Sequence, residues 1–334
     1  MLDLGGGLII NLLPIGGRQP HREAWPLDRL VRERAVALGS TLDASTLRNY
    51  TSALTSFLTF LRLHNMPLPP TEDSLSFYIV FMCRHITPAS VTTYLSGIIQ
   101  QLEPFYPTIR DIRHSQLVQR TLQGCHKLYG QPANRKQALT ISDLLLVTSQ
   151  ITSPTHDDLL FIAILVTGFF ALLRLGEMVF PDSMKLRNWR KITRRRTVTL
   201  APDRYGFTLP FHKADRLFAG NEILITRGAS PINAIDHFRA YLASRDLRFP
   251  FHSPLWLRQN GRVPARSFFI RRLRTFFPTS IAGQSMRAGG ATFLAELGVP
   301  PALIQARGRW TSDAFLIYIR KNPALLISLI TATS

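Results

Sequence analysis

The sequence predicts a mainly α-helical protein with a small antiparallel β-sheet, an α+β fold divided into two domains. Apolar residues recur at helical spacing along most of the chain, and short β-type runs occur only between residues 197 and 225. A polar, basic segment separates two unequal parts, and 334 residues suffice for about two domains. A hydrophobic fraction of 46% excludes an intrinsically disordered chain.

The N-terminal part begins with a glycine-rich segment, residues 1–40, which indicates a loosely ordered arm. Residues 41–129 follow as a small all-α domain, because apolar residues at helical spacing alternate with proline-containing turns. The helices expected there cover residues 45–61, 71–82, 90–102 and 112–128. The polar segment 130–138, GQPANRKQA, is the predicted linker between the domains.

Residues 139–334 are predicted to form the second domain. The apolar run Leu159–Leu173 is short for a membrane span and continues directly into charged residues, which favours a buried core helix. Short β-type runs separated by turn residues then predict an antiparallel sheet over residues 197–225. A helix is expected to begin at residues 140–143, and the further helices expected in this domain cover residues 231–242, 267–276, 286–297, 301–306 and 312–318.

The charge balance points to a polyanionic partner. Forty Lys and Arg face twenty-one Asp and Glu, which gives a formal net charge of +19 and a pI near 11.0. The part of the chain from residue 138 onwards holds most of this surplus, largely as arginine. Nucleic acid is the first candidate partner and an acidic membrane surface the second.

The two cysteines, Cys83 and Cys125, cannot form a disulfide framework and lack the CxxC spacing of a metal site. They are expected to be small buried residues in a reducing compartment. The N-terminus has no basic n-region, so a signal peptide is not expected. These features together predict a soluble, intracellular protein.

Several residues form a series of candidate functional groups, although each also fits an ordinary structural role. Arg174 and Glu177, three residues apart after an apolar helix, are expected to share a helix face. Lys213 follows a β-type run at the tip of an expected hairpin, and Arg287 lies among small residues at a helix start. Tyr318 ends an amphipathic run. The order of these residues along the chain carries more information than any one of them.

That order resembles the tyrosine recombinases of the phage-integrase family, over residues 41–320. The resemblance is closest to eukaryotic, fungal-type members associated with mobile elements. It implies a SAM-like core-binding domain followed by a catalytic domain, and a nuclear location if the host is eukaryotic. The strings that carry it are ALLRLGEM (171–178), FTLPFHKADRLFAG (207–220), GQSMRAGGATFLAELGVP (283–300) and IQARGRWTSDAFLIYIR (304–320).

The resemblance implies a strand-transfer chemistry that needs neither metal, ATP nor another cofactor. Tyr318 would attack the scissile phosphodiester and leave a covalent 3′-phosphotyrosine. Arg174 and Arg287 would bind the non-bridging oxygens and stabilise the transition state. Lys213 would act as general acid for the departing 5′-oxygen, and Glu177 would orient Arg174.

Two further positions qualify this expectation. Trp310 stands where many members of the family carry a second histidine, and its indole N–H can donate to phosphate. Gln284 replaces the histidine of the usual HisxxArg motif, and an amide cannot transfer a proton. His212, beside Lys213, is an alternative proton carrier. A degenerate relative that binds DNA without cleaving it therefore stays open, as does an unrelated helical nucleic-acid-binding module that would make the ordered series a coincidence.

The expected partner is double-stranded DNA, held between the two domains as in a clamp, with the protein assembling as a dimer or tetramer. Most of the arginines should contact phosphate, which fixes position without reading sequence. An apolar tail, residues 322–334, is expected to dock on a neighbouring protomer. The candidate DNA-binding residues are Arg48, Arg62, Arg84, Arg110, Arg113, Arg120, Arg194, Arg195 and Arg196.

Overall fold

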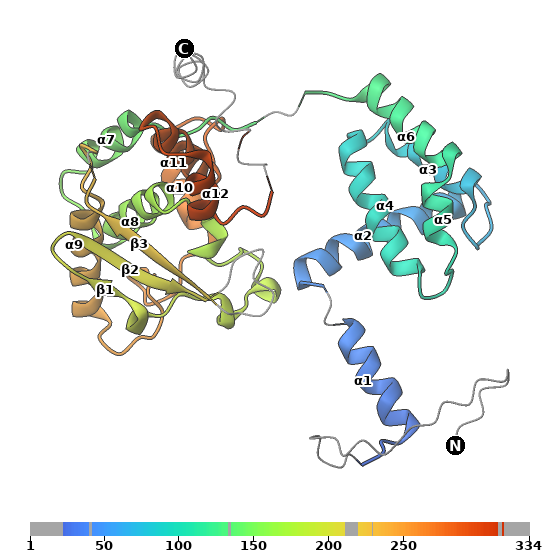
Figure 1. Ribbon diagram of the computed structural model, residues 1–334, viewed down its shortest axis with the longest axis horizontal. Helices are drawn as coiled ribbons and strands as arrows, with labels where there is room; N and C mark the ends of the chain where they lie inside the picture. Colours follow the sequence, from blue (N-terminus) through green and yellow to red (C-terminus); the bar gives the residue numbers. More distant parts are fainter. Residues whose placement is uncertain are drawn as a thin grey trace. The chain divides into compact units, whose positions relative to one another are not determined.

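The computed structural model describes residues 23–39, 42–132, 135–210, 220–228, 230–312 and 316. Within these residues the chain divides after Gln131 into an N-terminal and a C-terminal unit, which are described separately (Figure 1). The division falls inside the segment 130–138. The mainly α-helical architecture with one small antiparallel sheet confirms the predicted fold class.

The N-terminal unit is a helical bundle around one apolar core. Helix α2 packs against α4, and α3 packs against α6. Phe57, Tyr78 and Leu95, from three different helices, are fully buried at the centre of this core. The helices of the bundle are α2 (Ala44–Leu63), α3 (Glu72–Met82), α4 (Pro88–Leu102), α5 (Ile109–His114) and α6 (Gln116–Tyr129).

The single helix predicted over residues 112–128 is wrong, because Ser115 divides it into α5 and α6. The backbone of Ser115 is non-helical, with φ −59° and ψ 153°. Its side chain accepts a hydrogen bond from the Val118 N–H and thereby caps α6. A serine in this position satisfies one of the free N–H groups at the start of a helix, so a new helix begins there.

The arm predicted over residues 1–40 contains a helix that the sequence reading missed, α1 (Leu27–Gly39). The Leu30 N–H donates to the carbonyl oxygen of Pro26, so the helix starts at a proline, whose fixed φ suits a first turn. Most of its residues are good helix formers, but its apolar side chains at Leu27 and Val36 stay exposed. Residues 1–22 lie outside the described residues.

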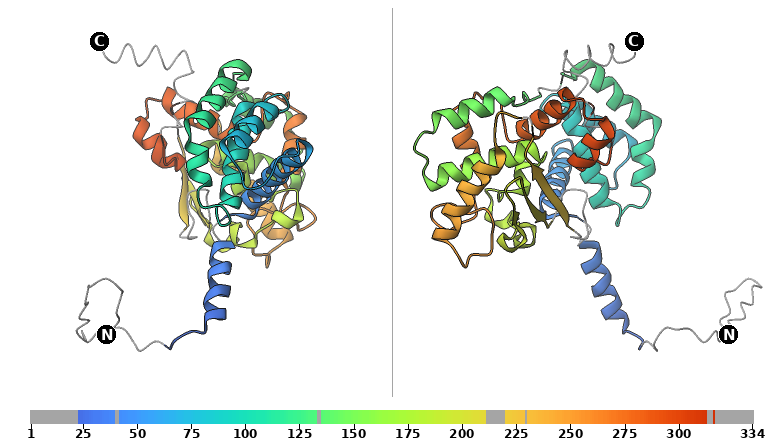
Figure 2. Two further views of the ribbon diagram at one scale, coloured as in Figure 1. Left: turned by 90° about the vertical axis from the view of Figure 1, so that its right-hand side faces the viewer. Right: turned by 60° about the vertical axis from the view of Figure 1, so that its left-hand side comes forward.

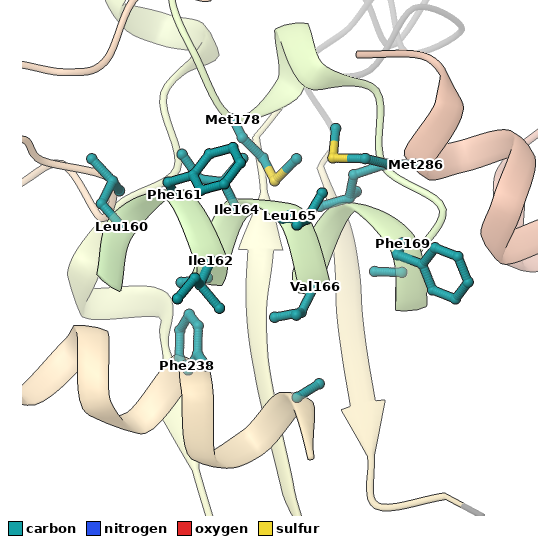
Figure 3. Close-up of a cluster of buried hydrophobic side chains, with 14 of the residues drawn as sticks. Leu160, Phe161, Ile162, Ile164, Leu165, Val166, Phe169, Met178, Phe238 and Met286 are labelled. Carbon is teal, nitrogen blue, oxygen red and sulfur yellow. The ribbon is translucent and has the colours of Figure 1, made fainter. Parts of the chain in front are cut away.

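The C-terminal unit is built around α8 (His156–Phe170), which is buried on nearly all sides. Phe238 of α9 packs below it, and Met178 and Met286 lie above it (Figure 3). Thr155 and Asp158 form a capping box at its start. The helices around it are α7 (Ile141–Gln150), α9 (Ala234–Arg248), α10 (Arg266–Arg274), α11 (Ser285–Glu296) and α12 (Pro301–Gly308).

The antiparallel sheet has the strand order β1 (Thr199–Leu200), β2 (Arg204–Leu209) and β3 (Asn221–Thr226). Its inner face packs on the helices: the rings of Tyr205 and Phe238 stack with centroids 4.0 Å apart, and the Tyr205 hydroxyl bonds Thr167 of α8 at 2.9 Å. Strands β2 and β3 form a hairpin that pairs Leu209 with Asn221.

Helices α11 and α12 lie side by side near the C-terminal end of the described chain (Figures 1 and 2, red). Leu172, Ala291 and Ile304 form a small separate core beneath them. This core joins the segment after α8 to two consecutive helices that lie far later in the sequence. The helix predicted over residues 312–318 falls almost entirely outside the described residues.

Candidate active site

The first arm of the candidate site is the turn that follows α8. The predicted helix through Leu173 is wrong at its end, because α8 stops at Phe170 and Leu172 adopts a left-handed conformation with φ 52°. Arg174 then caps a short 3₁₀ turn, η1 (Leu175–Glu177), so Arg174 and Glu177 do not share an α-helix face. They contact each other nonetheless.

The contact between Arg174 and Glu177 is a two-point interaction. The Arg174 backbone N–H donates to Glu177 Oε2 at 2.9 Å, and Arg174 Nη1 donates to Oε1 at 3.0 Å. The Glu177 side chain is 6% exposed, whereas that of Arg174 is 35% exposed. The buried carboxylate therefore anchors a guanidinium group that still reaches solvent.

The second arm is Arg287, which is buried at the start of α11. Its Nη1 donates to the carbonyl oxygen of Leu172 at 2.9 Å, and its Nη2 donates to that of Gly308. The left-handed conformation of Leu172 directs a carbonyl group at this guanidinium. Arg287 thus ties the end of α8 to the end of α12.

Two glycines of α11 allow this close approach. A Cβ atom at Gly289 would lie 2.0 Å from the carbonyl oxygen of Leu139, and one at Gly290 would lie 2.0 Å from that of Phe169. Neither oxygen belongs to a side chain that could move aside. The small residues at this helix start were predicted from the sequence to allow close approach of backbones. The packing of α11 against α8 depends on these glycines.

The third arm is the chain that leaves α12. Trp310 packs directly on Gly308, where a Cβ atom would lie 1.6 Å from its ring. The guanidinium carbon of Arg287 stands over the Trp310 ring, 4.1 Å from its centroid, as in a cation–π pair. Four of the predicted residues therefore form two contacting pairs, Arg174–Glu177 and Arg287–Trp310, and Arg309 links these pairs into one cluster.

Arg309 is a member of this cluster that the sequence reading did not assign. Its Nη2 lies 3.6 Å from Glu177 Oε2 and 3.4 Å from the Leu172 carbonyl oxygen. The sequence did offer an indication of this role, because Arg309 directly precedes the candidate residue Trp310 in the string GlyArgTrp. Its role depends on a backbone turn, which periodicity does not show.

The electrostatics of the cluster favour an anion. Arg174 and Arg309 both contact the Glu177 carboxylate, and Arg287 shares the Leu172 carbonyl oxygen with Arg309, so the cluster holds three guanidinium groups and one carboxylate. Burial lowers the pKa of the Arg309 guanidinium; the Glu177 carboxylate opposes this effect, and the charge of Arg174 adds to it. An anion placed among these groups would offset their mutual repulsion, and guanidinium groups bind phosphate oxygens well.

A cavity of about 340 Å³ lies beside this cluster. It is lined by Ala171 after α8, by Asn221 and Glu222 at the start of β3, and by Arg307 and Arg309. The start of β3, which directly follows the β2–β3 connection, therefore lies next to the arginine cluster. Lys213 and His212 belong to the connection between these strands and, like Tyr318, lie outside the described residues.

Gln284, at the position of the usual histidine, is the N-cap residue of α11. Its side chain is exposed and makes no capping hydrogen bond. Three residues further on, Arg287 is buried. The helix thus carries the two residues of the motif at its start, one facing solvent and one in the cluster.

The candidate DNA-binding residues differ in their surroundings. Arg113 is half-buried, its Nη1 makes no hydrogen bond, and burial lowers its pKa. Arg110 is bound by both carboxylate oxygens of Glu103. The other candidates in the N-terminal unit are exposed: Arg48, Arg62, Arg84 and Arg120.

The three consecutive arginines near the sheet also differ in their contacts and exposure. Arg195 donates from Nε at 3.0 Å and from Nη2 at 2.7 Å to the Asp246 carboxylate, which is a structural ion pair between distant segments. Arg194 Nη1 donates to Ser253 Oγ at 3.2 Å. Arg196 is exposed. The geometry favours Arg196 most as a surface cation.

Among the described residues, no group of three or more His, Cys, Asp and Glu side chains is arranged to hold a metal ion. In the same part of the chain, no helix combines the length and the apolar character that a membrane crossing requires.

The sequence matches no protein-family model and no curated protein. Solved structures do resemble the chain. The XerH site-specific recombinase, in a post-cleavage complex with a palindromic difH substrate, matches with TM-score 0.60 and 13% identity over 85% of this chain and 78% of that one. The fold is that of the tyrosine recombinases.

Two further structures agree with this recombinase fold. The Tn1549 transposon integrase, in complex with transposon right-end DNA, has TM-score 0.54 and 14% identity over 91% of this chain and 96% of that one. A lambda integrase dimer bound to a COC′ core site has TM-score 0.50 and 16% identity over 87% and 94%. At these identities the likeness establishes the recombinase fold and leaves activity to the residues.

Proposed function

We propose that the chain is a DNA strand transferase of the tyrosine-recombinase type, which cleaves and rejoins DNA through a covalent 3′-phosphotyrosine. The observation that carries the proposal is the cluster of Arg174, Glu177, Arg287 and Trp310 on a recombinase fold. Their order along the sequence identified these residues as candidates. They come from three segments of the chain, and the first and last segments are more than 100 residues apart.

The two arginines have the surroundings that phosphate binding requires. In the proposed reaction Arg174 and Arg287 bind the non-bridging oxygens, whose charge increases in the pentavalent transition state. The Glu177 carboxylate and the Leu172 carbonyl oxygen hold the two guanidinium groups before substrate binds. Removing one such donor typically lowers the rate by roughly 10²–10³. Trp310 packs beneath Arg287 and limits its movement.

We assign the proton donor and the nucleophile to two separate segments of the chain. We assign the nucleophile to Tyr318, eight residues after Trp310. The general acid for the 5′-oxygen is Lys213, in the connection between β2 and β3. The start of β3 supports the assignment, because it follows this connection directly and lines the same cavity as Arg309.

The exposed arginines of the N-terminal unit and the net charge of +19 support double-stranded DNA as the partner. In our proposal the two units clamp the duplex, and protomers assemble as a dimer or tetramer through the tail, residues 322–334. The relation to eukaryotic mobile elements, and with it a nuclear location, belongs to the proposal and rests on the four sequence strings.

A second candidate function is DNA binding without cleavage, which the glutamine at position 284 favours. Loss of a proton-transfer partner costs roughly 10²–10⁴ in rate. An arginine cluster that still binds phosphate would keep its affinity for DNA without that partner. The two functions therefore differ in chemistry and share the binding surface.

A trapping experiment separates the two functions. The protein is incubated with suicide duplexes that lose a short 5′-hydroxyl fragment on cleavage, and covalent protein–DNA adducts are resolved in detergent. Strand transfer predicts an adduct with the wild type and none with Tyr318→Phe, while the Kd for DNA is the same for both. DNA binding with no adduct on any duplex would refute the strand-transfer proposal and support the second function.

A further inference from the structure

Two strained backbone positions meet in the candidate site. Among the described residues, Leu172, Arg309 and Asn65 are the non-glycine residues with positive φ. Leu172 and Arg309 are in direct contact, since Arg309 Nη2 donates to the Leu172 carbonyl oxygen. Such conformations are unfavourable for residues with a Cβ atom, and they concentrate where structure serves function.

The turn itself does not require an arginine. Arg309 occupies the left-handed position after α12, with φ 55° and ψ 43°, where helices most often carry glycine. Glycine would adopt this conformation without strain. The side chain therefore adds something that the turn alone does not need.

That side chain connects the partners of both site arginines. Its Nη2 lies 3.6 Å from the Glu177 carboxylate, which holds Arg174, and 3.4 Å from the Leu172 carbonyl oxygen, which holds Arg287. The Arg309 side chain is 9% exposed, and its Nε is buried without a hydrogen-bond partner. A cation so placed has little access to solvent and bridges the two arms of the cluster.

We propose that Arg309 is a positioning residue, which fixes Arg174 and Arg287 in one arrangement for the scissile phosphate by bridging Glu177 and the Leu172 carbonyl group. This inference rests on the proposed strand-transfer function. Arg309 stabilises the arrangement before DNA binds and acts through its two neighbours. The reaction then depends on Arg309 through the geometry of the cluster, since a displacement of about 1 Å can lower a rate roughly 10²-fold.

The decisive variant is Arg309→Gly, because glycine suits the left-handed turn and removes the bridge together with one local hydrogen bond, from Arg309 Nη1 to the Arg307 carbonyl oxygen. A melting curve checks that the variant is folded. At saturating suicide duplex we expect single-turnover adduct formation to slow by roughly 10- to 100-fold, with the DNA concentration for half-saturation changed less than about 3-fold. If the arginine served only the turn, Arg309→Gly would react as fast as the wild type, and the proposal would be overturned.

Two further variants separate positioning from charge. In the wild type a single atom, Arg309 Nη2, contacts both partners. Arg309→Lys keeps the charge, but the lysine side chain is shorter and its ammonium group does not extend as far as Nη2, so we expect a rate between those of wild type and Arg309→Gly. Arg271→Ala removes the same charge from an exposed position on α10, away from the cluster, and should react at the wild-type rate at saturating DNA. Equal loss in Arg271→Ala and Arg309→Gly would refute positioning in favour of net charge.

A measurement without chemistry distinguishes this inference from the strand-transfer proposal. Rotation about the Nε–Cζ bonds of Arg174 and Arg287 is followed by NMR in DNA-free, arginine-labelled protein, with assignments from Arg174→Lys and Arg287→Lys. We expect both rotations to be faster in Arg309→Gly than in the wild type. Unchanged rotation would overturn the positioning role. Faster rotation in a protein that forms no adduct would support positioning and reject strand transfer.

Discussion

The glycine pair of α11 allows a sharp test of how the site is held together. In Gly290→Ala, the new Cβ atom would lie 2.0 Å from the Phe169 carbonyl oxygen and 2.6 Å from Leu172 Cδ2. Alanine favours a helix over glycine by about 1 kcal/mol. Overpacking against backbone costs about 1–3 kcal/mol, and a clash with a main-chain oxygen belongs at the upper end.

We therefore expect Gly290→Ala to lower the free energy of unfolding by about 2 kcal/mol, which corresponds to roughly 4–8 °C in Tm for a unit of this size. The same shift moves Leu172 and Arg287 apart, so adduct formation should slow more than the loss of stability explains. Scanning calorimetry measures Tm, and the suicide duplex measures the rate well below it.

Gly124→Ala is the matched control. Gly124 also lies within a helix, α6, but a Cβ atom there would meet nothing within 4 Å. The same substitution should raise the stability of the N-terminal unit by about 1 kcal/mol through helix propensity alone. A Gly290→Ala protein as stable as the wild type would refute the argument that close approach of α8 and α11 shapes the site.

Three further predictions concern other parts of the chain. Burial lowers the pKa of His156 below its ordinary value near 6.5, so the unfolded state binds the proton more readily than the folded state. The free energy of unfolding therefore falls as the pH drops through 6.5. Urea titrations between pH 7.5 and 5 should show a smaller fall in this free energy for His156→Gln than for the wild type. Burial and the neighbouring Cys125 raise the pKa of the Cys83 thiol to about 12, so a thiol reagent at pH 8 should label Cys83 only after unfolding, and rapid labelling of the native protein would contradict this. Deleting residues 322–334 should reduce dimers and tetramers on DNA in gel-shift and light-scattering experiments, and unchanged assembly would rule out docking through the tail.

The sequence predicted those parts of the fold that depend on local pattern. Most of the predicted apolar run, residues 159–170, lies in the buried helix α8, and the β-type runs near Gly206 and Leu224 pair as expected, because periodicity and turn residues act over a few neighbouring positions. The order of candidate residues also selected Arg174 and Arg287, which the structure brings to one carbonyl–carboxylate network.

The errors arose where tertiary contacts determine the backbone. The end of α8, the 3₁₀ turn at Glu177 and the left-handed turn at Arg309 depend on contacts between segments that are distant in sequence. Helix α1 was not predicted, because the glycine-rich segment before it led to the whole of residues 1–40 being interpreted as a loosely ordered arm. In most of a folded protein the sequence pattern, the intrinsic propensity and the tertiary packing favour the same local structure. At functional sites they often disagree, and the turns around this candidate site are an example.

The position of Gln284 makes it the most informative single substitution for the chemistry. The Gln284 side chain is exposed and makes no capping bond, so Gln284→His changes neither the packing of α11 nor the contacts of Arg287. A histidine there adds a group that titrates near neutral pH. If proton transfer limits cleavage, adduct formation should increase by roughly 10²-fold or more, with unchanged Tm and Kd. Equal rates in the wild type and in Gln284→His would mean that Lys213 or another group already carries the proton, and that the glutamine is no defect.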